Sequence, residues 1–124
     1  MVSKFKPLLM KVLIVDDSAR MRRIIHSVVA DLADEVLECA DGSEAVLAYL
    51  NYRPDWVLMD IKMPRMDGLE AAAQICAAAP DARIVMVTNY EGGDLREAAR
   101  QAGASEYVIK EDLLAIRRIL LRER

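Results

Sequence analysis

The sequence predicts a single α/β domain of the (βα)5 type, in which a doubly wound parallel sheet of five strands is covered by helices. Short, continuous apolar runs alternate along the 124 residues with longer segments whose apolar residues recur with helical period. Hydrophobic residues make up 54% of the chain and charged residues 30%, a composition typical of a compact globular protein. A chain of this length has room for one domain.

Five apolar runs predict the strands. The first, Val12–Val15, is apolar on both faces, as expected in the middle of a sheet that is covered on both sides. Glu35–Cys39 alternates polar and apolar residues better than the first run does, which suits a less buried strand near a sheet edge. The remaining runs are Trp56–Met59, Ile84–Val87 and Tyr107–Ile109. Parallel pairing with right-handed crossovers then puts helices on both faces.

Helices are predicted between these strands and after the last one. The residues expected to cap or open the first three are Ser18, Asp41-Gly42-Ser43 and Asp67-Gly68. The residues expected to face the core are Met21, Ile24, Ile25, Val28 and Leu32, then Ala45, Val46, Tyr49 and Leu50, then Leu69, Ala72, Ala73 and Cys76. The fourth helix follows Gly92-Gly93 and ends at Gly103, and the last begins near Asp112, with Leu114 and Leu121 facing outward.

Charge and hydropathy exclude several classes of function. The net charge of −3 gives no basic field, so direct nucleic-acid binding is not expected. No apolar run approaches the roughly 20 residues of a membrane span, and the N-terminus lacks the features of a signal peptide. We therefore expect a cytoplasmic protein without membrane insertion. Cys39 and Cys76 have no metal-ligand spacing and are expected to be reduced core residues.

Polar residues that could bind a ligand or take part in a reaction lie at the ends of four predicted strands. In strand order they are Asp16 and Asp17, Asp60, Thr88 and Lys110. The carboxyl ends of parallel strands meet at one edge of a sheet, so these side chains are expected to converge. Three carboxylates repel one another unless a cation neutralises them, and Mg²⁺ accepts oxygen ligands of this kind. The pattern therefore indicates a magnesium site.

Asp60 is the candidate nucleophile. A carboxylate beside Mg²⁺ can attack phosphorus to form an acyl phosphate, while Thr88 and Lys110 donate to the phosphoryl oxygens. The adjacent carboxylates Asp16 and Asp17 are better placed as a metal-binding pair. Each residue alone has a simpler interpretation as a helix cap, a turn residue or a solvated surface residue, and only the complete set favours the phosphoryl site.

The ordered set resembles the receiver domains of bacterial response regulators, the switches of two-component signalling. The matching segments are Asp16-Asp17, Asp60-Ile-Lys-Met-Pro-Arg-Met-Asp-Gly68, Thr88 and Gly103-Ala-Ser-Glu-Tyr-Val-Ile-Lys110. The resemblance covers residues 11–122, which leaves residues 1–10 as an N-terminal extension and shows no output domain. It implies a flavodoxin-like strand order of 2-1-3-4-5, in either a stand-alone receiver or part of a longer regulator.

The resemblance also implies roles for the acidic residues. Asp60 corresponds to the phosphoacceptor and contributes to the Mg²⁺ site. Asp17 corresponds to a direct Mg²⁺ ligand and Asp16 to a ligand that acts largely through water. The main-chain carbonyl of Lys62 completes the protein ligands.

Switching and partners follow from the same resemblance. Thr88 corresponds to the switch hydroxyl, Lys110 to the lysine that pairs with the phosphoryl group, and Tyr107 to an aromatic that changes rotamer with Thr88. The phosphoryl donor is a phosphohistidine on a sensor histidine kinase or a histidine phosphotransfer protein. A downstream protein is expected on the face formed by the fourth helix, the fifth strand and the last helix. A homodimer formed on phosphorylation is the alternative partner.

Two positions depart from the family pattern. Glu111 stands where many receivers have proline after the lysine, so the usual cis Lys-Pro bond cannot form. Asn89 replaces a small residue after the switch hydroxyl. Lys62 and Tyr90 each follow a site residue by two positions, and we hypothesise that together they shield the acyl phosphate from water.

The preferred function is a phosphorylation-activated switch whose only catalysis is phosphotransfer to itself and its own dephosphorylation. An aspartyl-phosphate phosphatase or hydrolase normally has an acidic residue two positions after the nucleophile, where this chain has Lys62. A receiver-like module that is never phosphorylated would not need the complete set of site residues. A flavin or nucleotide binder is disfavoured because no Gly-rich phosphate loop follows the first strand.

Overall fold

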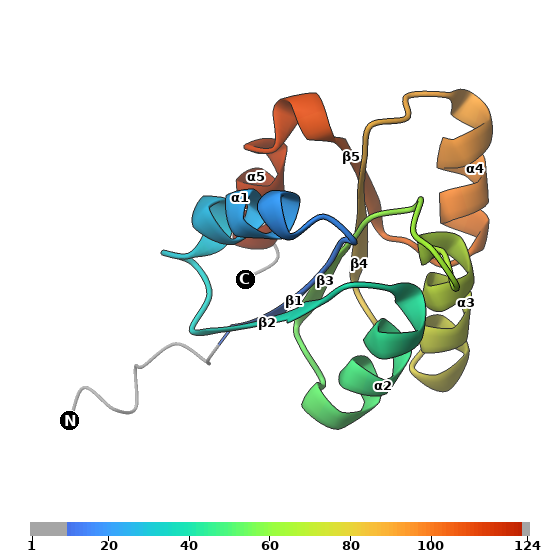
Figure 1. The fold of residues 1–124 in the computed structure, drawn as a ribbon, viewed down its shortest axis with the longest axis horizontal. Coiled ribbons are helices and arrows are strands. Elements are labelled where there is room, and N and C mark those ends of the chain that lie inside the picture. Colours follow the sequence, from blue (N-terminus) through green and yellow to red (C-terminus); the bar gives the residue numbers. More distant parts are fainter. Residues whose placement is uncertain (1–9, 123–124) are drawn as a thin grey trace.

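Strands and helices alternate along the chain in the computed structural model, which describes residues 10–122 (Figure 1). The strands are β1 (Lys11–Val15), β2 (Glu35–Cys39), β3 (Trp56–Met59), β4 (Ile84–Thr88) and β5 (Glu106–Ile109). The helices are α1 (Ala19–Val29), α2 (Gly42–Tyr52), α3 (Gly68–Ala78), α4 (Gly93–Gln101) and α5 (Ala115–Arg122). A short 3₁₀ helix, Lys110–Asp112, separates β5 from α5.

All five strands are parallel and form one sheet in the order β2-β1-β3-β4-β5. Helices α1 and α5 lie together on one face, while α2, α3 and α4 cover the other (Figure 1). The predicted doubly wound (βα)5 fold and its strand order are confirmed. Residues 1–9 of the predicted N-terminal extension lie outside the described residues, and Met10 is buried beside the first strand.

The central strands supply two hydrophobic cores because successive side chains point to opposite faces. Val12 and Ile14 join the core beneath α1 and α5, whereas Leu13 and Val15 join the core beneath α2, α3 and α4. Strand β2 lies at the edge, and most of its residues are exposed or half-buried, as predicted for a less buried strand. The central strands are thus buried on both faces, and the site lies where they end.

The predicted helix caps are confirmed. Side-chain oxygens of Ser18, Asp41 and Asp67 accept hydrogen bonds from the main-chain N–H three residues later, at 3.1, 3.1 and 2.9 Å. Gly103 follows α4 with a φ of +105°, a conformation that glycine adopts readily. Ser18 and Asp41 lie within three residues of the strands that they follow, and Gly103 lies three residues before β5.

The predicted inward face of α3 is wrong in part. Ala73 is exposed, whereas Ala71, Ala72 and Ile75 are buried. The close approach of Gly68 to the end of β3 sets the rotation of this helix. A run of three alanines has no apolar face that could have indicated the rotation from sequence alone.

The last helix begins later than predicted, at Ala115 rather than near Asp112. The chain first turns through the 3₁₀ helix, and hydrogen bonds of the i to i−3 type continue at Ile116 and Arg117. The described residues contain no cis peptide bond.

The observed exposure of three leucines agrees in part with the orientation predicted from the sequence. Leu114 and Leu121 are exposed as predicted, but Leu50, predicted to face the core, is 39% exposed. Cys39 and Cys76 are both free, the first buried and the second half-buried. Within residues 10–122, no helix has the length and apolar character needed to cross a membrane.

Candidate functional site

The predicted site residues lie at the carboxyl ends of four strands. Asp16 directly follows β1, Asp60 follows β3, and Thr88 is the last residue of β4. Lys110 follows β5 as the first residue of the 3₁₀ helix. The N–H of Asp60 donates to the carbonyl of Val15 at 2.8 Å, so main-chain hydrogen bonding continues to the site edge. The sheet itself therefore brings these distant residues to one edge.

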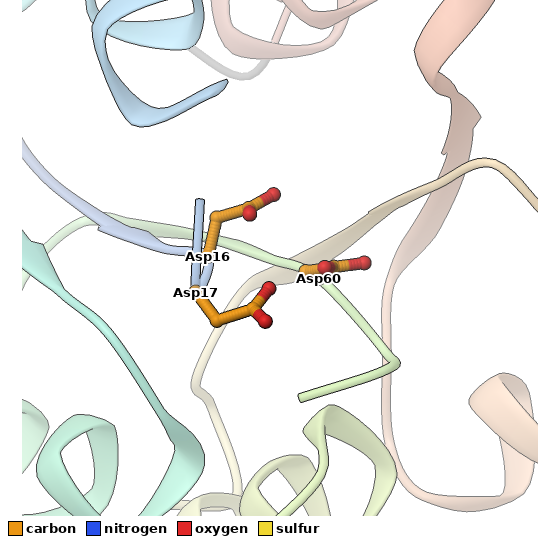
Figure 2. Close-up of side chains that lie close together, drawn as sticks. All are labelled: Asp16, Asp17 and Asp60. Atoms are coloured by element: carbon orange, nitrogen blue, oxygen red, sulfur yellow. The ribbon is translucent and has the colours of Figure 1, made fainter. Parts of the chain in front are cut away.

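Three carboxylates converge at this edge. One oxygen from each of Asp16, Asp17 and Asp60 lies within 4.8 Å of the others. Figure 2 shows Asp16 and Asp17 projecting from the chain after β1 and Asp60 from the end of β3, with all three carboxylates turned toward the same space. Asp16 is 1% exposed and Asp60 6% exposed, whereas Asp17 is exposed. Two of the three carboxylates are thus removed from bulk water.

Lys110 supplies the ammonium that faces this cluster. Its Nζ atom lies 2.9 Å from Oδ2 of Asp16 and 3.4 Å from Oδ2 of Asp60. Burial disfavours the charge on Lys110, but the pairing with Asp16 and Asp60 outweighs it and raises the pKa of Lys110 above its ordinary value. The lysine therefore stays charged, and one ammonium faces three carboxylates.

Burial also acts on Asp60. Together with the charge of Asp16, it raises the pKa of Asp60 to about 6, although Lys110 and the N–H of Ile61 act in the opposite direction. The Ile61 N–H donates to Oδ1 at 2.8 Å. The ionised carboxylate is thus held in a site that disfavours its charge, and a bound cation would favour the ionised form.

The donor atoms fit a hard divalent cation. Oδ1 of Asp16 accepts from the N–H of Ser18 at 2.9 Å. Oδ2 of Asp16 is buried and pairs with the ammonium of Lys110 at 2.9 Å. Oxygen-only ligands and an excess of negative charge are the conditions that suit Mg²⁺.

The chain after Asp60 returns to pack directly against it. The N–H of Gly68 donates to the carbonyl of Ile61 at 2.8 Å. A Cβ atom at Gly68 would lie 2.0 Å from the main-chain oxygen of Asp60, far inside contact distance. Only glycine therefore allows the N-terminus of α3 to approach the predicted phosphoacceptor this closely.

An ion pair that the sequence analysis missed holds the middle of the same loop. Arg65 has a φ of 62°, and its guanidinium pairs with the carboxylate of Asp41, whose side chain is 1% exposed. The hydroxyl of Ser43, the guanidinium of Arg65 and the N–H of Glu44 hold the pKa of Asp41 well below its usual range. No local pattern indicates this pair, because its partners lie 24 residues apart.

Thr88 and Tyr107 are linked through the main chain of Tyr90. Oγ1 of Thr88 accepts from the N–H of Tyr90 at 3.3 Å, and the hydroxyl of Tyr107 donates to the carbonyl of Tyr90 at 2.5 Å. Within the described part of the chain, no hydrogen bond joins Thr88 to Asp60 or Lys110. The predicted residues thus form two groups, the carboxylates with Lys110, and Thr88 with Tyr107.

Lys62 and Tyr90 also meet. Nζ of Lys62 lies over the ring of Tyr90, 5.5 Å from its centroid, and both residues are exposed. The chain thus places the two loops that follow Asp60 and Thr88 in direct contact. The contact agrees with the hypothesis that these side chains act together, and their effect on an acyl phosphate stays a prediction.

Comparison with known protein families identifies the family to which this chain belongs. The family model of the response regulator receiver domain matches residues 12–120. The chain belongs to this receiver family. Members act as phosphorylation-activated switches in two-component signalling, and the predicted family and function are confirmed at this level.

Two relatives and one solved structure illustrate the similarity. The chemotaxis protein CheY of Listeria monocytogenes is 42% identical to this receiver over 103 residues, covering 82% of this chain and 87% of that protein. Protein-glutamate methylesterase/protein-glutamine glutaminase 5 of Geobacter metallireducens is 46% identical over 105 residues, 82% of this chain but only 29% of the enzyme. The Borrelia burgdorferi CheX-CheY-BeF₃-Mg²⁺ complex matches with a TM-score of 0.81 and 27% identity, covering 93% of this chain and 90% of that one.

Proposed function

We propose that Asp60 accepts a phosphoryl group from a phosphohistidine on a sensor histidine kinase or a histidine phosphotransfer protein. The observation that carries this proposal is the convergence of the carboxylates of Asp16, Asp17 and Asp60, two of which, Asp16 and Asp60, lie beside the ammonium of Lys110. Such a cluster combines a nucleophile, a cation site and a fixed positive charge within reach of one another. No pocket for a second substrate is needed, because the carboxylate itself is modified.

Phosphotransfer consists of one displacement. A carboxylate oxygen of Asp60 attacks phosphorus, the P–N bond of the phosphohistidine breaks, and the electron pair of that bond returns to the imidazole nitrogen. Lys110, already beside Asp60, pairs with a phosphoryl oxygen as negative charge moves outward. Thr88 turns its hydroxyl from Tyr90 toward another phosphoryl oxygen.

Asp16, Asp17 and Asp60 would hold Mg²⁺ together with the main-chain carbonyl of Lys62, Asp16 acting largely through water. When bound, the ion neutralises the excess negative charge of the carboxylates and of the phosphoryl oxygens. The close approach of one carboxylate oxygen from each of the three aspartates supports this assignment.

The output follows from the contacts of Tyr90. When Thr88 leaves the N–H of Tyr90, the main-chain link to Tyr107 changes, and Tyr107 changes rotamer. Gly92 and Gly93, at the start of α4, are exposed, and a Cβ atom at either would meet nothing within 4 Å, so no neighbouring group packs against this turn. The change reaches the face of α4, β5 and α5, where a downstream protein binds.

The output face offers features that a partner could use. A groove of about 240 Å³ lies between α4 and β5 and is lined by residues that include Arg96, Arg100 and Tyr107. Arg96 lies over the ring of Tyr107, with 4.6 Å between Cζ and the ring centroid. A rotamer change of Tyr107 would therefore move a cation on this face. A homodimer formed on phosphorylation is the alternative occupant.

On this proposal the receiver catalyses only its own phosphorylation and dephosphorylation, in the cytoplasm, without binding nucleic acid itself. The hydrolase alternative remains disfavoured, since Lys62 contacts Tyr90 and offers no carboxylate for acid–base catalysis. Residues 11–122 constitute the receiver unit, whether it stands alone or belongs to a longer regulator.

Incubation with acetyl phosphate and Mg²⁺, followed by intact mass measurement, tests the proposal. We expect a mass increase of one phosphoryl group in the native chain, and none in Asp60→Asn or in the absence of Mg²⁺. Asp55→Asn, a change of the same kind at the amino end of β3, is the matched control and should be phosphorylated like the native chain. A persistent single-phosphoryl increase in Asp60→Asn would refute the assignment.

A further inference from the structure

Arg22, near the N-terminus of α1, contacts the main chain between the two adjacent aspartates. Its Nη1 atom donates to the main-chain oxygen of Asp16 at 2.6 Å. This oxygen belongs to the peptide group that joins Asp16 to Asp17. Because a peptide group is planar, the orientation of its carbonyl fixes the plane that contains the Cα atoms of both residues. One hydrogen bond from Arg22 therefore acts on two carboxylates of the cluster.

The sheet does not supply this hydrogen bond. The N–H of Asp16 donates to the carbonyl of Cys39 at 3.1 Å, so one side of the residue is tied to β2. Strand β1 ends at Val15, and no main-chain N–H of the described residues donates to the carbonyl of Asp16. The guanidinium is thus the group that fixes this peptide.

Arg22 is itself held in place. Its Nε atom donates to Oε1 of Glu38 at 3.0 Å, and the other carboxylate oxygen of Glu38 lies 3.2 Å from Nδ1 of His26. Glu38 belongs to β2 and is paired in register with Ile14 of β1. The rigid planar guanidinium can bond Glu38 and the carbonyl of Asp16 at once. The Arg22 side chain is only 19% exposed.

We propose that Arg22, clamped by Glu38, is a positioning residue for the divalent-cation site formed by Asp16, Asp17 and Asp60. The inference rests on the proposed function, because it assumes that these carboxylates hold Mg²⁺. Arg22 does not touch the phosphoryl group or the ion in this role. It holds the peptide between Asp16 and Asp17 in the orientation that presents both carboxylates to the ion.

Electrostatics and positioning make opposite predictions for loss of this side chain. Removing a cation near three carboxylates strengthens Mg²⁺ binding if charge alone matters. Removing the hydrogen bond to the Asp16 carbonyl weakens binding if positioning matters. Residues that hydrogen-bond to metal ligands without contacting the metal typically contribute about 10–100-fold to metal affinity. The sign of the change therefore separates the two effects.

The test is a titration of the unphosphorylated chain with MgCl₂, followed through the backbone amide chemical shift of Asp17, for the native chain, Arg22→Met, Arg22→Lys and Glu38→Gln. Arg23→Met is the matched control, since Arg23 lies next in α1, is exposed and has no ion pair within residues 10–122. Thermal unfolding without Mg²⁺ is measured in parallel to detect a general loss of structure.

We expect Arg22→Met to raise the dissociation constant for Mg²⁺ about tenfold, the lower end of that range. Arg22→Lys, which keeps one donor for the carbonyl, should recover part of the loss, and Glu38→Gln should weaken binding less than Arg22→Met. Arg23→Met should bind Mg²⁺ as tightly as the native chain or more tightly. Equal or tighter binding by Arg22→Met overturns the inference, and if that variant does not fold, native affinity in Glu38→Gln does so.

Failure of the proposed function gives a different result. If the native chain takes no phosphoryl group from acetyl phosphate but the Mg²⁺ affinities follow the expected order, the phosphoacceptor assignment fails and the role of Arg22 stands. If the native chain is phosphorylated and Arg22→Met binds Mg²⁺ normally, the role of Arg22 alone is refuted.

Discussion

The ammonium of Lys62 lies over the aromatic ring of Tyr90, 5.5 Å from its centroid, and joins the loops that follow β3 and β4. Exposed cation–π contacts of this kind contribute about 0.5–1 kcal/mol. Water that hydrolyses an acyl phosphate on Asp60 must arrive from outside the strand ends. A contact between these two loops is positioned to hinder that approach.

The contact predicts a longer-lived phosphorylated state. Lys62→Ala or Tyr90→Ala should speed phosphate loss about two- to fivefold, the factor that corresponds to the energy of the contact. The double variant should be no faster than the faster single variant, because both remove the same interaction. Decay of the intact phosphorylated mass measures the rate, with the exposed neighbour Glu91→Ala as control. An unchanged decay rate in both single variants would refute the hypothesis that this contact shields the acyl phosphate.

Asp60→Asn should stabilise the fold at neutral pH when Mg²⁺ is absent. The pKa of Asp60 is raised to about 6 in the folded chain, so its ionisation opposes folding. The shift from an ordinary value near 3.8 corresponds to roughly 3 kcal/mol at pH 7.5. The stabilising effect of a protonated Asp60 is complete below the unfolded pKa and is lost as pH rises through the folded pKa.

The measurement for Asp60→Asn is urea unfolding in EDTA at several pH values. The variant should exceed the native chain in unfolding free energy above pH 6, and the difference should shrink between pH 6 and pH 4. A difference that is constant over this interval would contradict the assigned pKa. Added Mg²⁺ should reduce the advantage of the variant at pH 7.5, because the ion binds the native cluster.

Gly68→Ala should destabilise the protein. The new Cβ atom would lie 2.0 Å from the main-chain oxygen of Asp60, and neither backbone can yield without displacing the start of α3. We expect a loss of at least about 1–3 kcal/mol, the usual range for overpacking. Gly93→Ala is the matched control, since nothing lies within 4 Å of its Cβ position and alanine favours a helix. Equal denaturation midpoints for the two variants would contradict the close packing at Gly68.

Tyr107→Phe should loosen the loop before α4. The variant loses the hydrogen bond to the carbonyl of Tyr90 but keeps the ring beneath Arg96. The cost is about 0.5–1.5 kcal/mol, and hydrogen exchange of the loop amides should accelerate. Glu91→Ala, at an exposed position of the same loop, is the control. Native exchange rates in Tyr107→Phe would show that the bond does not order the loop.

The strands, the helix caps and the residues at the strand ends could be predicted because they depend on local sequence patterns. Apolar runs such as Val12–Val15 identify a buried strand, and a cap such as Ser18 identifies the start of the next helix. The rule that parallel strands end at one edge brought Asp60 near Lys110 before any coordinates were considered. These residues meet as predicted.

The remaining features depend on contacts that no local pattern encodes. The burial of Ala71 in place of Ala73 follows from the helix rotation set by Gly68. Residues 71–73 are all alanine, so their sequence does not indicate which of them faces the core. The link from Arg22 to the carbonyl of Asp16 involves a main-chain acceptor that every residue possesses. The late start of α5 reflects the 3₁₀ turn after Lys110, which helical periodicity does not distinguish from an α-helix.

The cluster takes its ammonium from Lys110, directly after β5, while two of its carboxylates follow β1. During synthesis the N-terminal strands emerge first, yet the charged group is incomplete until Lys110 has emerged and β5 has paired with β4. A nascent or truncated chain that ends before β5 presents acidic residues without their counter-charge. On the proposed function, the ability to accept a phosphoryl group therefore depends on the pairing of β5 with β4, and not on the acidic strand ends alone.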